Sequence, residues 1–166
     1  MAEVIKSRLR VKQMFMGEPI TEEAKVATQE WGNALPVTLR DDELLITEEA
    51  PEEEPVHSHE NDSPEEVDFT GKGLKMTGSF IRATREQLKT MLGGDVKETK
   101  YHHSTTKLNL NKAFKIVCHD GSEVVIPNAD GYVLLNLALG KGAVSKFPFS
   151  FNLKRASASW DCDLIF

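Results

Sequence analysis

Residues 132–153 read YVLLNLALGKGAVSKFPFSFNL, and this stretch predicts a β-hairpin at the centre of the fold. Its first half, 132–139, is apolar on both faces of an extended chain, which predicts a strand deep inside a sheet. Its second half, 147–153, alternates strictly between apolar and polar side chains, so one face should be buried. Gly140 and Gly142 supply the positive φ that a short hairpin turn requires. The hairpin therefore predicts a β core.

Working outward from this hairpin, the same two patterns predict further strands along the chain. They fall at 4–11, 36–40, 43–47, 74–81, 101–110, 113–119, 123–126 and 160–166. Asp120-Gly121 predicts a tight turn between two of them. Pro148 cannot donate a ladder hydrogen bond, so its part of the strand is expected at a sheet edge or a bulge. Gly78 indicates a bulge or a close approach of neighbouring groups.

One short helix is predicted over residues 84–92. Thr84 and Gln87 fit a capping box, and Gly93-Gly94 ends the helix. Its apolar stripe is formed by Leu88, Met91 and Leu92. A second short helix is expected from Thr21 to Trp31. The chain is thus expected to be mainly β, with a single domain over residues 1–166.

Length and composition restrict the class of protein. The chain has 166 residues, enough for one domain, and 40% of them are hydrophobic. No apolar run approaches the roughly 20 residues of a membrane span, and the first residues lack the apolar stretch of a signal peptide. We therefore expect no membrane partner and synthesis in a cytoplasm. Cys118 and Cys162 are expected to be buried, reduced thiols.

The charge of the chain is unevenly distributed. Of the 26 acidic residues, 13 lie in the range from Asp41 to Asp68, which contains no Lys or Arg. The remainder of the chain therefore has 13 acidic and all 20 basic residues, a net charge of +7. We call residues 42–68 the acidic insert and expect it to be mobile. Its candidate contact residues are Glu48, Glu49, Glu52, Glu53, Glu54, Glu60, Asp62, Glu65 and Glu66. It is either a solvated, disordered loop or an arm that meets a basic surface on a partner.

A basic strand is expected near the N-terminus. Its outer face would carry Lys6, Arg8, Arg10 and Lys12, opposite Ile5, Ser7, Leu9 and Val11. Such residues guard a sheet edge against unwanted pairing, or they contact nucleic acid.

No catalytic or metal-binding pattern is evident in the sequence. It lacks a glycine-rich phosphate loop, a Gly-x-Ser-x-Gly elbow and a Cys-x-x-Cys pair. His57 and His59 have no fixed further ligand, and His102 and His103 should point to opposite faces of a strand. Cys118 and the following His119 should diverge likewise. We expect no enzyme activity, no cofactor and no metal site.

The order of elements resembles a known family. Residues 71–80, GKGLKMTGSF, are followed by Thr84-x-Glu86-x-Leu88 and by Leu92-Gly93-Gly94. Residues 120–129, DGSEVVIPNA, then lead to 134–139, Gly140-Lys141-Gly142 and 147–153. Over residues 69–154 this order is similar to that of the tail tube proteins of long-tailed phages.

The resemblance implies a β-sandwich or half-barrel subunit with a flanking helix. Six copies would form a ring, and stacked rings would form the tube through which phage DNA leaves the capsid without specific binding. Other partners would be the tape measure, the tail terminator and the tail tip, and the protein would reside in the virion tail after assembly in the host cytoplasm. The acidic insert would stack rings, decorate the exterior or do both.

Strand parity gives candidate positions facing the lumen of such a tube. They are Asn136, Ser150, Asp161 and Asp163, and the set inverts if the alternation is read one residue out of register. Two alternatives stay open beside the tube subunit. One is a ring-forming terminator or adaptor, and the other is a nucleic-acid-binding β-barrel that uses the basic N-terminal strand.

Overall fold

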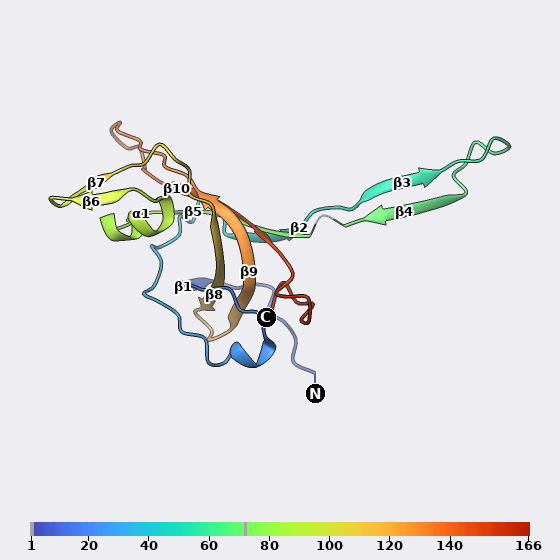
Figure 1. Ribbon diagram of the computed structural model, residues 1–166, viewed down its shortest axis with the longest axis horizontal. Coiled ribbons are helices and arrows are strands. Elements are labelled where there is room, and N and C mark those ends of the chain that lie inside the picture. The colour runs from blue at the N-terminus through green and yellow to red at the C-terminus, as the bar shows by residue number, and fades with distance from the viewer. Residues whose placement is uncertain (1, 72) are drawn as a thin grey trace.

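The computed structural model describes residues 2–71 and 73–166, and it is mainly β. Strands make up 40% of the chain and helix 7%, so the predicted fold class is confirmed. The principal sheet is antiparallel and curls into a half-barrel (Figure 1). Its strand order is β1 (Val11–Gly17), β8 (Leu110–Cys118), β9 (Glu123–Val133), β10 (Phe147–Leu153), β5 (Leu74–Phe80) and β2 (Leu45–Glu48).

Smaller elements surround this sheet. Two separate hairpins consist of β3 (Glu52–Val56) with β4 (Glu66–Thr70), and of β6 (Asp95–Lys97) with β7 (Lys100–His102). The helix α1 (Arg85–Leu92) contacts β6, β7 and β9, and a single 3-10 turn, η1, spans Glu23–Lys25. In Figure 1 the β3–β4 hairpin projects from the sheet on the side opposite α1 and the β6–β7 hairpin.

Strand β10 lies inside the sheet, and its alternation forms the centre of the core. Its apolar face is buried, while its intervening residues are half-buried or exposed, as predicted. The Phe151 ring lies 4.6 Å from that of Phe114, and the Phe149 ring lies 4.4 Å from that of Phe80. A Cβ on Gly78 would come within 2.8 Å of Phe149 Cζ, which confirms the predicted close approach.

Two predictions about the central hairpin are wrong. Strand β9 ends at Val133, and residues 134–139 leave the sheet, with Leu137 59% and Leu139 90% exposed. Pro148 lies in an interior strand, paired with Ser79 of β5. The Pro148 carbonyl points toward β9, where it accepts from the Leu134 N–H just after β9 ends. In an antiparallel strand the N–H and C=O of one residue point to the same side, so the N–H that Pro148 lacks would also point there. Proline is tolerated because the ladder with β9 stops at this point.

Other predicted boundaries also differ from the structure. Residues 4–10 form no strand, and residues 21–31 form only η1 in place of a helix. The predicted strand over 36–40 is reduced to a single bridge between Thr38 and Phe80. The predicted strand over 101–110 is not continuous: its start belongs to β7 and its last residue, Leu110, begins β8. Near the C-terminus a single bridge, Ile165 to Val125, replaces the expected strand over 160–166.

The helix follows the sequence prediction closely. The Gln87 N–H donates to Thr84 Oγ1 at 3.2 Å, and the Thr84 N–H donates to Gln87 Oε1 at 2.9 Å, which completes the capping box. Met91 and Leu92 are buried, and Gly93 ends the helix at a φ of 78°. The apolar stripe therefore attaches α1 to the core.

Replacement of the cap should lower stability measurably. Thr84→Ala removes the acceptor for the Gln87 N–H, and we expect it to reduce the free energy of unfolding by about 1 kcal/mol in urea denaturation. Thr90→Ala is the matched control, because the Thr90 hydroxyl only donates back to the Glu86 carbonyl within the same helix. Equal losses in the two variants would contradict a capping role.

Candidate assembly surfaces

Residues 49–71, which contain the larger part of the acidic insert, form a hairpin that we call the arm. It continues the β2–β5 ladder outward, since Glu48 pairs with Leu74 and the Glu49 N–H donates to the Gly73 carbonyl at 3.3 Å. Of the two alternatives left open for the acidic insert, the disordered loop does not describe the structure, which forms a regular hairpin. All residues of β3 and β4 are exposed, and Figure 1 shows the arm extending into solvent away from the body.

The register of the arm separates its side chains into two faces. Residues that lie directly opposite in an antiparallel pair share a face. The pairs Glu53–Phe69 and Pro55–Val67 form one face, which we call the apolar face. The pairs Glu52–Thr70, Glu54–Asp68 and Val56–Glu66 form the other, which we call the acidic face.

The apolar face has no cover in the monomer. Phe69 is 63% exposed and Val67 is 37% exposed. A two-stranded hairpin that stands alone in water is marginally stable, because it has no third layer or strand to pack against. An amphipathic arm of this kind is therefore suited to contact another surface.

The predicted contact residues are distributed along the whole arm. Glu48 and Glu49 lie at its base, and Glu60, Asp62 and Glu65 lie at its tip beyond the strands. The tip is held by Ser58 Oγ, which donates to Glu65 Oε1 at 2.8 Å, and by the Glu65 N–H, which donates to the Val56 carbonyl at 2.9 Å. Val67 and Phe69 were missed by the sequence analysis, although the alternation of 66–70 carries the signal.

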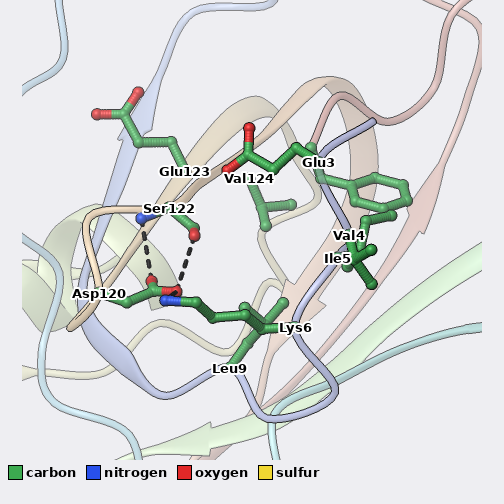
Figure 2. A pocket seen from close by; sticks show the side chains of 10 residues that line it. Glu3, Val4, Ile5, Lys6, Leu9, Asp120, Ser122, Glu123 and Val124 are labelled. Carbon is green, nitrogen blue, oxygen red and sulfur yellow. Dashed lines mark hydrogen bonds and ion pairs between the residues drawn. The ribbon is translucent and has the colours of Figure 1, made fainter. Parts of the chain in front are cut away.

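The N-terminal segment (residues 2–10) is exposed, bends at Ser7 and lies across the turn between β8 and β9. Figure 2 shows it beside Asp120 and Ser122, where it lines a cleft of about 440 Å³ together with Phe166. Lys6 Nζ lies 3.2 Å from Asp120 Oδ2. Hydrogen bonds from Ser122, with a further contribution from Lys6, hold the pKa of the Asp120 carboxyl below its usual value.

The four basic residues predicted near the N-terminus are only partly on a strand. Lys12 lies in β1, which is an edge strand of the sheet, whereas Lys6, Arg8 and Arg10 precede it. Among the residues that the structure describes, Arg8, Arg10 and Lys12 form no ion pair. The backbone of residues 4–9 likewise forms no hydrogen bond with any described residue.

The principal sheet has two edges that another chain could extend. At β1 the Leu35 N–H donates to the Met14 carbonyl at 2.7 Å, so this edge is covered at one point. At β2 the ladder to β5 is the only backbone pairing of 45–48 within the described chain. An open, curved sheet with free edges is a template for addition of further strands.

The junction of β2 with the sheet is held by a charged contact. Asp42 Oδ2 accepts from Lys146 Nζ and from Ser79 Oγ, both at 2.7 Å. The hydrogen bond from Lys146, followed by that from Ser79, lowers the pKa of the Asp42 carboxyl. The contact fixes the start of the acidic region against β5 and the residue before β10.

One face of the half-barrel is polar around Ser150, a predicted lumen position. Ser150 pairs with Tyr132 and with Thr77, and its neighbour on the same face of β10, Asn152, pairs with Asp130 and Lys75. These cross-strand partners were missed by the sequence analysis, because strand parity within one segment does not identify the strands beside it. Lys154, 2.8 Å from Asp130, lowers the pKa of that carboxyl by hydrogen bonding.

The other lumen candidates lie elsewhere. Asn136 is in the exposed loop after β9, where it forms a bridge with Lys146. Asp161 and Asp163 are in the C-terminal segment, and Asp161 Oδ1 lies 3.7 Å from Arg155 Nε. The structure therefore places only Ser150 on the polar face of the sheet and does not bring the four residues together.

The cysteines and histidines form no common site in the described residues. Cys118 is buried and Cys162 is half-buried, and both are free thiols whose pKa is raised by burial. Within residues 2–71 and 73–166, no three His, Cys, Asp or Glu side chains are grouped so that they could hold a metal ion. No helix of this part of the chain has the length and apolar character needed to cross a membrane.

No protein-family model matches this chain, and no curated protein matches it either.

Proposed function

We propose that this protein is the structural subunit of a phage tail tube, which assembles into stacked, hexameric rings. The observation that carries the proposal is the arm, an amphipathic hairpin exposed on both faces that projects from a half-barrel sheet. The order of motifs over residues 69–154, which resembles that of tail tube proteins, supports the same function. The subunit would act in the virion tail, after assembly in the host cytoplasm.

The sheet geometry supports ring formation. Strand addition between the β1 edge of one copy and the β2 edge of the next would convert six half-barrels into a closed wall without free edges. The same contact repeated head to tail closes a ring, whereas a contact along the axis that does not close continues as a stack. A polar inner wall would let DNA pass, since a strongly basic one would retain phosphates.

Electron microscopy of the purified protein tests the proposal. At high concentration, or after addition of a tail initiator complex, we expect rings and stacked tubes with an open lumen in negative stain. Rings that never stack would indicate the terminator or adaptor alternative. A chain that stays monomeric in sedimentation under both conditions would overturn the proposal, and retention on DNA at low salt would then favour the nucleic-acid-binding alternative.

A further inference from the structure

Strand β4 presents an alternating pattern with an open outer edge. Val67 and Phe69 lie on the apolar face of the arm, and Glu66 and Asp68 lie on its acidic face. In the described chain β4 pairs only with β3, so its other edge is free to accept a strand. A strand that fits there must carry apolar residues on one side and basic residues on the other.

The N-terminal segment has this complementary pattern. Ile5 and Leu9 alternate with Lys6, Arg8 and Arg10, which predicts a strand. The backbone of residues 4–9 nevertheless has no hydrogen-bond partner among the described residues, and the Arg10 carbonyl accepts a single bond, from the His119 N–H at 2.9 Å. Ile5 is 64% exposed and Leu9 is 44% exposed, so its apolar side chains also lack cover. Its alternating residues therefore match both faces of β4 at once.

We propose that residues 5–10 of one copy add to β4 of a second copy as the third strand of the arm. The inference rests on the proposed function, because it names the surface that receives the arm in the assembly. Ile5 and Leu9 would extend the apolar face beside Val67 and Phe69. The basic residues would lie along the acidic face, with Arg8 and Arg10 free to pair with Glu66 and Asp68.

The contact must be between copies. In Figure 1 the N-terminus lies beneath the body, whereas the arm projects from its side, so the two segments of one chain do not meet. Strand β4 is the favoured edge because β3 contains Pro55, which cannot donate to an added strand, and β4 contains no proline.

The addition would stabilise both segments. The unpaired backbone groups of the N-terminal segment gain partners, and the arm becomes a three-stranded sheet, which is more stable than an isolated hairpin. Opposite charges directly across neighbouring strands add favourable pairs. Release of the segment breaks two contacts of the monomer. One is the Lys6–Asp120 ion pair, whose side chains are 66% and 24% exposed, and the other is the hydrogen bond from the His119 N–H to the Arg10 carbonyl. The new strand pairing must outweigh both.

A cross-link between two chains that carry introduced cysteines at different positions tests the contact directly. In a Cys162→Ser background, a Ser7→Cys chain is mixed with a Val67→Cys chain and treated with a short bismaleimide. Ser7 lies on the apolar side of the segment, so we expect a cross-linked dimer in at least tenfold excess over the control pair of Ser7→Cys with Lys97→Cys. Lys97 is an exposed residue of β6 on the opposite side of the molecule.

A charge exchange tests the energetics of the same contact. Arg8→Glu with Arg10→Glu should raise the concentration needed for assembly by roughly tenfold. Adding Glu66→Lys and Asp68→Lys to this variant should restore assembly, and Lys97→Glu with Lys100→Glu, which changes net charge equally, should have no effect. Thermal unfolding of each variant verifies that the monomer is intact.

The outcomes separate the inference from the proposed function. Tubes that form without the Ser7–Val67 cross-link, and that are unaffected by the Arg8 and Arg10 reversals, would overturn the inference alone. A chain that yields the cross-link but no rings or tubes would overturn the tube and retain the strand addition. A monomer without the cross-link would overturn both.

Discussion

A variant in which residues 50–72 are replaced by Asn-Gly should fold as a stable monomer and fail to form tubes. The β2–β5 ladder continues to Glu49 and Gly73, so a two-residue turn can close it as a hairpin. None of the residues of β3 and β4 is buried or belongs to the core. We therefore expect the free energy of unfolding to change by less than about 0.5 kcal/mol.

The effect on assembly should be close to complete. In the proposed assembly the arm carries the apolar face that would contact a neighbouring copy, and its removal takes this surface away. Circular dichroism during urea denaturation measures the fold, and negative-stain microscopy with sedimentation measures assembly. If the variant that lacks residues 50–72 polymerises normally, the arm is an external decoration that assembly does not require.

Substitution within the arm distinguishes loss of contacts from loss of length. Val67→Thr with Phe69→Thr keeps the hairpin and removes its apolar face, so this variant should lose assembly as well. Val56→Thr is the control, because Val56 is 52% exposed on the acidic face. It should assemble as the unmodified chain does.

Local signals explain which elements were predicted correctly. Strand β10, helix α1 and the Asp120-Gly121 turn each have a pattern that is complete within a few residues: strict alternation, a capping box and a glycine with positive φ. Each of these patterns has one favourable backbone conformation, and the surrounding structure agrees with it.

The errors arise where a pattern depends on a partner that the chain itself does not supply. Residues 4–10 alternate as a strand should, but they precede β1, whose pairing with β8 starts at Val11 and Cys118. Beyond Cys118 the chain turns into β9, so only the Arg10 carbonyl finds a backbone partner, the His119 N–H. The continuous apolar run 132–139 fits either a buried strand or an exposed surface, and periodicity cannot distinguish the two. Beyond Val133 it has no partner strand apart from the single Asn136–Lys146 bridge.

The missing helix over 21–31 has a different cause. Ile20 and Trp31 pack in the same small cluster with Ala113 and Val125. A straight helix between them would hold its ends about 16 Å apart. The shared packing therefore outweighs the helical preference of the intervening residues, and only η1 forms.

The charge of the acidic insert misled the prediction of its conformation. Glutamate and aspartate are disfavoured in strands, and the twelve acids of residues 42–68, without a basic residue, indicate disorder from composition alone. The hairpin forms because the β2–β5 ladder already aligns its two ends. The sequence contains the apolar residues of this face, Pro55, Val67 and Phe69. That they lie on one face follows only from the register in which β3 pairs with β4.

Phe151→Ala should destabilise the monomer more than any substitution on the assembly surfaces. Phe151 is 1% exposed at the centre of β10, with its ring against Phe114 and Phe149 at 4.6 and 5.9 Å. Removal of a buried phenyl ring loses its transfer free energy and leaves a cavity, which together cost about 3–5 kcal/mol. Since domains of this size are stable by only about 5–15 kcal/mol, the variant should be partly unfolded at 37 °C.

The strand beside Phe151 cannot move closer to fill the cavity. Gly131 lies directly across from Phe151 in β9, so close that a Cβ there would overlap the Ser150 carbonyl, and the two backbones cannot move nearer.

Urea denaturation followed by circular dichroism gives the loss in the free energy of unfolding, with Phe151→Leu as a milder substitution that retains most of the volume. Phe166→Ala is the control of equal chemistry, because Phe166 is 69% exposed and should change stability by less than about 0.5 kcal/mol. Similar denaturation midpoints for Phe151→Ala and Phe166→Ala would mean that β10 is not the centre of the core, and the half-barrel on which the arm and both sheet edges depend would have to be reconsidered.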